Sequence, residues 1–127
     1  MNYESLDRKL EKLKIEDFIW LIYIGIIILS WYSNSLERKY FIYNDLESRE
    51  KYRKIMIFIF FILIIVYFYF LKDFYDDVKN INTSEREEVK KLTSLSFIAS
   101  LLIFISGLIF LYIAIKDEDL NVELAFN

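Results

Sequence analysis

The stretch IMIFIFFILIIVYFYFL, residues 55–71, runs for seventeen residues without a single Asp, Glu, Lys or Arg. Two further stretches, residues 18–36 and 95–115, are equally free of charge and are 19 and 21 residues long. An α-helix rises about 1.5 Å per residue, so roughly 17 to 25 apolar residues cross a hydrocarbon core about 30 Å thick. Backbone polar groups in lipid must be satisfied within the segment, and the three stretches therefore predict three transmembrane helices.

The remaining 70 residues carry every charge of the chain, although charged residues make up 28% of its 127 residues. This segregation predicts one all-α integral membrane unit, which we expect in a bacterial inner membrane. The composition is also typical of an AT-rich genome. A cleaved signal peptide is an alternative reading of residues 18–36, since Ser33 and Ser35 have the spacing of a cleavage site. Residues 1–17 mix acidic and basic side chains and do not form a basic leader, so we expect this span to be retained.

The residue types that are missing argue against catalysis. The chain has no His and no Cys, which removes the commonest general base, all thiolate chemistry and the usual transition-metal ligands. The net charge is −3 and no phosphate-binding loop is present, so nucleic-acid binding is not expected either. The sequence predicts a protein that is not an enzyme and that needs no cofactor.

The charged segments predict how the spans are connected. Residues 1–17 read as an amphipathic helix with an apolar stripe, which fits either a helix on the membrane surface or a short coiled-coil seam. Residues 37–54 are expected to form an interfacial loop and the start of the second helix, and residues 72–94 the tip of a long antiparallel hairpin. The stripe consists of Tyr3, Leu6, Leu10 and Leu13.

Two capping-box patterns predict where the second and third helices begin. Asn44 with Glu47 is the first pattern, and Ser84 with Glu87 is the second. The second helix is expected to run from Asp45 to about Asp76. The third is expected from near Glu85 to Lys116, since neither stretch contains a Pro.

The last segment, residues 116–127, is acidic and leaves two interpretations open. Leu120, Val122, Leu124 and Phe126 alternate with other residues, which indicates an extended segment that adds to a partner's strand. A disordered acidic tail is the other interpretation. A protein partner is therefore expected at the 72–94 tip or at the 117–127 tail. An orientation with the N-terminus inside places nine basic residues in the cytoplasm against seven outside, which weakly favours N-inside and C-outside.

One face of the third span carries small and hydroxylated side chains at helical spacing. Such a face either packs helices closely, with hydroxyls bonding across or back onto their own helix, or lines a pore with Ile103 or Phe110 as a constriction. The face consists of Thr93, Ser96, Ser100, Ile103, Gly107, Phe110 and Ala114.

A basic cluster, Lys51, Arg53 and Lys54, precedes the second span. It either pairs with neighbouring carboxylates along a solvated helix or meets anionic headgroups.

Functionally, the absence of any titratable group from the spans argues against ion-coupled transport. Three helices cannot enclose an aqueous path, so we expect self-association in the lipid bilayer. The leading hypothesis is a homo-oligomeric channel or pore-forming effector of bacterial antiviral defence or stress that a partner or signal activates. A non-catalytic structural or regulatory subunit of a larger membrane complex is the alternative. A holin-like lysis protein is the third reading, although its tail would be basic and this one is acidic.

Overall fold

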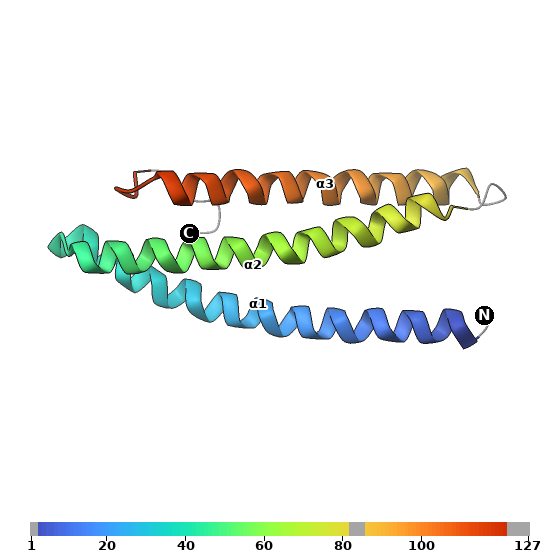
Figure 1. Cartoon of the computed structure of the whole chain (residues 1–127), viewed down its shortest axis with the longest axis horizontal. Coiled ribbons are helices and arrows are strands. Elements are labelled where there is room, and N and C mark those ends of the chain that lie inside the picture. The colour runs from blue at the N-terminus through green and yellow to red at the C-terminus, as the bar shows by residue number, and fades with distance from the viewer. Residues whose placement is uncertain (1–2, 82–85, 122–127) are drawn as a thin grey trace.

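The computed structural model describes residues 3–81 and 86–121 and is all-helical in that part of the chain (Figure 1). Helix α1 spans Tyr3–Tyr43, α2 spans Leu46–Lys79 and α3 spans Glu87–Lys116. The predicted all-α class and the long hairpin of the second and third helices are confirmed.

Helix α1 is one unbroken rod of 41 residues, about 62 Å long. The sequence predicts a separate helix over residues 1–17 and an interfacial loop from residue 37, and neither break is present in the structure. The segment between residues 37 and 43 contains no Gly or Pro, and Glu37, Arg38 and Lys39 are all good helix formers. The high helix propensity of these residues therefore extends α1 to Tyr43, beyond the charge-free stretch that ends at residue 36.

The turn between α1 and α2 is only two residues long. Asn44 adopts φ 54°, a left-handed conformation that Asn tolerates better than most residues, and this reverses the chain. The N-cap of α2 is Asp45 rather than the predicted Asn44: its Oδ1 accepts the Glu47 backbone N–H at 3.2 Å, and its Oδ2 accepts the Ser48 hydroxyl at 2.8 Å. The Ser48 hydroxyl holds the pKa of Asp45 below its ordinary value, so the cap is charged at neutral pH.

The hairpin differs slightly from its predicted boundaries. Helix α2 continues to Lys79, three residues beyond the predicted end. Helix α3 begins at Glu87 with Arg86 as its N-cap residue and no side-chain cap bond, so the predicted box starting at Ser84 does not cap it; Ser84 itself lies outside the described residues.

The three helices form a single layer with α2 in the middle (Figure 1). Helix α2 packs against both α1 and α3, whereas no described Cα atoms of α1 and α3 lie within 8 Å of each other. The apolar core lies along α2, where Met56, Ile59 and Phe60 are almost completely buried. Toward its N-terminal end, α1 diverges from α2, as Figure 1 shows.

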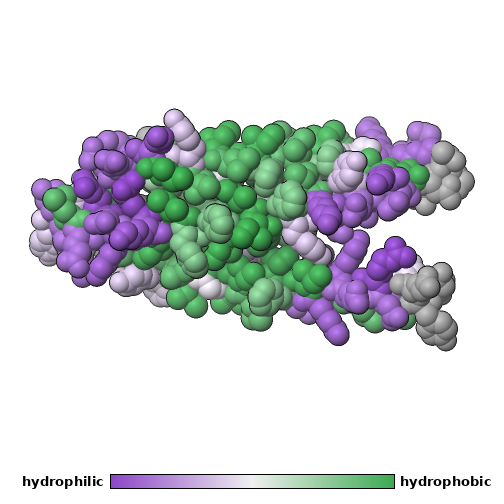
Figure 2. Space-filling view, in the orientation of Figure 1, coloured by the Kyte–Doolittle hydropathy of each residue, from purple (hydrophilic) through white to green (hydrophobic). Residues whose placement is uncertain are grey.

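Large apolar side chains cover the middle of the outer surface. Figure 2 shows a broad hydrophobic band between two hydrophilic ends, and Trp31, Ile27 and Leu21 in this band are 79%, 66% and 66% exposed. In the most apolar stretch of 18 residues, only 28% of the residues of α2 and 17% of those of α3 are buried. A core helix of a soluble protein would be mostly covered, and soluble monomers rarely expose so large an apolar patch. The surface therefore indicates a membrane protein.

Two helices, α2 and α3, are long and apolar enough to cross a membrane in the described part of the chain. The span predicted at residues 18–36 is the middle of α1, and its membrane crossing stays a prediction.

Candidate functional site

The small-residue face of α3 is packed against α2 of the same chain. Ser100, Gly107 and Ala114 are its buried members, and they repeat every seven residues. A Cβ atom built on Gly107 would lie 3.1 Å from Cδ2 of Tyr67 and 3.5 Å from Cγ1 of Ile64. A side chain at position 107 would require the Tyr67 ring to shift by a few tenths of an ångström, whereas Gly packs against the ring as it stands.

The hydroxyl groups of this face bond to their own helix. Thr93 Oγ1 donates to the Val89 carbonyl at 2.8 Å, and Ser96 Oγ donates to the Leu92 carbonyl at 3.0 Å. Ser100 Oγ donates to the Phe97 carbonyl at 2.7 Å. Each hydroxyl proton is therefore used within α3, which lets these polar groups sit in an apolar environment without bridging to another helix.

The remaining members of the face divide between the hairpin contact and a recess. Phe110 stacks on Phe60 of α2 with ring centroids 5.7 Å apart and an interplanar angle of 16°. Ile103 is 50% exposed and borders the recess together with Ser96. Close helix packing thus explains why Ser100, Gly107 and Ala114 are buried. Ser96 and Ile103 remain accessible at the recess.

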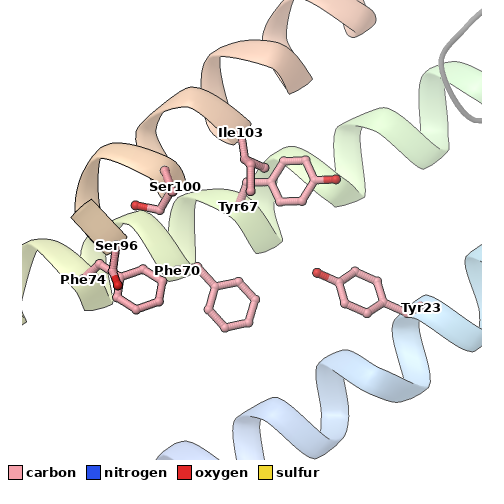
Figure 3. Close-up of a pocket in the computed structure, with 8 residues that line it drawn as sticks. Tyr23, Tyr67, Phe70, Phe74, Ser96, Ser100 and Ile103 are labelled. Carbon is pink, nitrogen blue, oxygen red and sulfur yellow. The ribbon is translucent and has the colours of Figure 1, made fainter. Parts of the chain in front are cut away.

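The recess has a volume of about 390 Å³ and lies between α1 and α3, over α2 (Figure 3). In Figure 3 the hydroxyl ends of Tyr23 and Tyr67 both point into the space between the helices, and the ring of Phe70 projects into the same space. All three helices contribute to its wall, which is mainly aromatic. Besides Ile103, the wall includes Tyr23, Tyr67, Phe70, Phe74, Ser96 and Ser100.

The contact between α1 and α2 depends on a buried serine. Ser33 is completely buried, and its Oγ donates to the Ser30 carbonyl at 2.8 Å and lies 3.8 Å from Sδ of Met56. Ser33 is thus a small residue buried at the contact of α1 with α2, as Gly107 is at the contact of α3 with α2. The sequence predicts for Ser33 only a cleavage-site spacing with Ser35, but Ile19, Ile26 and Ser33 recur every seven residues and all are buried.

The basic cluster does not act as one unit. Lys51 pairs with Glu47 at 3.4 Å and Lys54 with Glu50 at 3.5 Å, both along the exposed side of α2. Arg53 turns the other way, and its Nη2 donates to the Ile115 carbonyl at 2.8 Å. A cation at the last carbonyls of α3 satisfies an otherwise open acceptor and complements the helix dipole.

The chain after α3 returns to the same end of α2. Arg49 Nη1 lies 3.2 Å from Oδ1 of Asp119, and the Arg49 guanidinium also lies 5.7 Å from the centroid of the Tyr40 ring on α1. Leu120 adopts φ 56° and packs against the core. The predicted strand pattern extends over Val122, Leu124 and Phe126, which lie outside the described residues.

At the opposite end, an ion pair holds α1 to α2. Lys12 Nζ lies 2.9 Å from Oδ1 of Asp73 and 3.9 Å from Oδ1 of Asp77. The hydrogen bond to Asp73 raises the pKa of Lys12 above its ordinary 10.5. No pattern in the sequence indicates this pair, because the partners are separated by 61 positions.

Within residues 3–81 and 86–121, no three His, Cys, Asp or Glu side chains lie together in a group that could hold a metal ion. Comparison of the chain with known protein families, with curated proteins and with solved structures finds no match.

Proposed function

We propose that the protein is a non-catalytic membrane protein that works as a homo-oligomeric channel or pore, with protomers associating through the outward face of α1. The single-layer arrangement carries this proposal. A layer of three helices has two faces and encloses no path, so any conducting route must form between copies. The layer leaves large apolar side chains exposed on α1, where a second copy can cover them.

The outward face of α1 has the spacing of a helix-pairing seam. Its residues recur at intervals of three, four or eleven positions along most of the helix, and eleven is seven plus four, so the spacing is that of a heptad seam. The buried residues Ile26 and Ser33 lie two positions after Ile24 and Trp31, and two residues turn a helix by about 200°. The seam therefore faces away from α2. It consists of Leu6, Leu10, Leu13, Ile24, Ile27 and Trp31, all of them exposed in a single chain.

The first part of the seam supplies the driving force. Within lipid an exposed Ile gains little by meeting another apolar side chain. Leu6, Leu10 and Leu13, however, stand among charged residues before the apolar stretch and are 42%, 48% and 53% exposed. Because α1 continues unbroken through residue 17, this segment extends the axis of the predicted span and does not turn onto the membrane surface. Burial against a second copy removes these leucines from water.

In this proposal the protein permeabilises a bacterial inner membrane as an effector, with the N-terminus and the hairpin tip on the cytoplasmic side. The absence of charged residues from the predicted spans supports a passive path over coupled transport.

The chain lacks Cys, so single cysteines test the seam without background. Leu10→Cys and Ile24→Cys should each give disulfide-linked dimers on mild oxidation in membranes, because like positions meet in a parallel pair. Tyr112→Cys is the matched control, since Tyr112 is 64% exposed but lies on α3. Cross-linking at Tyr112 with none at positions 10 and 24 would contradict the α1 seam.

Function itself is tested by flux. Liposomes containing the wild-type protein should release a small ion trapped inside, and Leu10→Asp with Leu13→Asp should lower both the oligomer fraction and the release. Release that stays unchanged when the oligomer is lost would contradict an oligomeric pore.

A subunit of a larger membrane complex is the second candidate, and one observation favours it. Ser100 and Gly107 are buried against α2, which removes the centre of the hydroxylated face from any pore lining. Under this reading the α1 seam binds a helix of another protein. A monomer at every protein concentration in mild detergent, with no cross-linking at position 10, would favour the subunit.

A further inference from the structure

A second, smaller hollow of about 260 Å³ adjoins the recess between α1 and α3. It shares Tyr23 and Phe70 with the recess and adds Glu16, Ile19 and Trp20. The two therefore form one groove, with Glu16 at its mouth and Ile103 at its far end. Glu16 stands two residues before the charge-free stretch of α1, so the mouth lies where water meets lipid and the far end lies in the apolar region.

The mouth of the groove carries a net negative charge. Glu16 forms no ion pair with any described residue. The nearby ammonium of Lys12, one turn earlier, is already held by Asp73 at 2.9 Å. Since Lys12 and Asp73 pair with each other, the Glu16 carboxylate is the charged group that lines the groove.

The wall next to Glu16 is suited to a cation. The rings of Trp20 and Tyr23 pack edge to face with centroids 5.7 Å apart, and Trp20 is 64% exposed. Aromatic faces attract cations through the ring quadrupole, and Trp does so best. Further in, the wall is formed by aromatic rings and Ile103, and the volume of about 390 Å³ lies within the range of ligand pockets.

We infer that this groove binds an amphiphilic organic cation, with the positive centre between the Glu16 carboxylate and the rings of Trp20 and Tyr23 and the apolar body in the recess beyond Phe70. An anionic lipid is disfavoured because its phosphate would meet the Glu16 carboxylate at the mouth. A neutral acyl chain would fill the recess but would leave the Glu16 carboxylate without a charged partner. The inference goes beyond the proposed function and concerns a groove that a single protomer forms by itself.

The test uses the full chain in nanodiscs of zwitterionic lipid and tetraphenylphosphonium as the probe. Trp31→Phe leaves Trp20 as the single tryptophan, so its fluorescence reports on the groove. Tetraphenylphosphonium should quench Trp20 saturably, whereas tetraphenylborate, of matched size and opposite charge, should not. Equilibrium dialysis on the same samples measures binding independently, with empty nanodiscs subtracted for partitioning into lipid.

Glu16→Gln in this background should weaken tetraphenylphosphonium binding about three- to tenfold, as expected for loss of one partly exposed charge contact. Glu11→Gln is the matched control because Glu11 is exposed on the same helix, about 140° around the axis from Glu16, and it should bind like the parent. Phe70→Leu, which keeps the charge and shortens the wall, should also weaken binding. Equal affinity in the Glu16→Gln and Glu11→Gln variants, or equal binding of tetraphenylborate, would overturn the inference.

Discussion

Gly107 of α3 faces the ring of Tyr67 on α2 so closely that a Cβ atom on the glycine would lie 3.1 Å from Cδ2 and 3.3 Å from Cε2 of that ring. Gly25 of α1, in contrast, has nothing within 4 Å of where a Cβ atom would be. The two glycines of the chain are therefore opposite cases, one at a helix contact and one in open space, and they supply a variant and its control.

Gly107→Leu should destabilise the hairpin by about 1 to 3 kcal/mol, the usual cost of overpacking a tight contact. Gly25→Leu should change the stability by much less, since nothing lies within 4 Å of the Cβ position and the residue is exposed. Reversible unfolding in mixed micelles with increasing SDS measures both. Equal loss in the two variants would mean that Gly107 does not set the distance between α2 and α3.

Ser33→Leu should separate α1 from α2 while the α2–α3 hairpin stays intact, because Ser33 is completely buried at the contact with Met56. The free energy of unfolding is expected to fall by about 1 to 3 kcal/mol. Ser33→Ala keeps the small volume and removes only the bond to the Ser30 carbonyl, so its cost should be smaller. Distances between spin labels on α1 and α2, compared with a pair on α2 and α3, locate the change.

Arg53→Leu should loosen the C-terminal end of α3 by about 1 kcal/mol, because it removes the donor that satisfies the Ile115 carbonyl. Amide exchange from residue 113 onward should accelerate, while exchange in the middle of α3 stays the same. Asp119→Asn removes the partner of Arg49 and should matter less, since this pair is exposed. If Asp119→Asn loosened the end of α3 more than Arg53→Leu, the ion pair would outweigh the carbonyl contact.

The contact between Lys12 and Asp73 should weaken at high pH. The hydrogen bond to Asp73 raises the pKa of Lys12 in the folded state. Its stabilisation is therefore fully present below the ordinary value of 10.5 and is lost as the pH rises through the raised pKa. The distance between labels at positions 9 and 76 should lengthen in that range. In Asp73→Asn the labels should be further apart already at neutral pH, and the alkaline change should disappear.

The sequence predicts the helices well because their cause is local. Three charge-free stretches and the scarcity of Gly and Pro are enough to place α2 and α3 within a few residues. The interfacial loop predicted from residue 37 is wrong, because charged residues of high helix propensity such as Glu37, Arg38 and Lys39 can continue a helix into water.

The site is less predictable because its contacts are not local. The spacing of Ser100, Gly107 and Ala114 indicates a packing face, yet nothing in the sequence says that α2 covers it. Lys12 with Asp73 and Arg53 with the Ile115 carbonyl join positions 61 and 62 apart. Such contacts depend on how far each helix overlaps its neighbour, a quantity that the turn lengths constrain only weakly.

Because α2 is the only helix that touches both others, the membrane insertion of this chain has a natural order. The α2–α3 hairpin contains the tight contact between Gly107 and Tyr67, to which α1 contributes no atom. With α1 crossing the membrane as its charge-free stretch predicts, it would insert first and stay in lipid until α2 follows, since helices that are stable singly associate afterwards. A ribosome-bound chain that ends shortly after α2 would thus already hold the Ser33–Met56 contact, whereas the hairpin closes only after α3 has left the translocon.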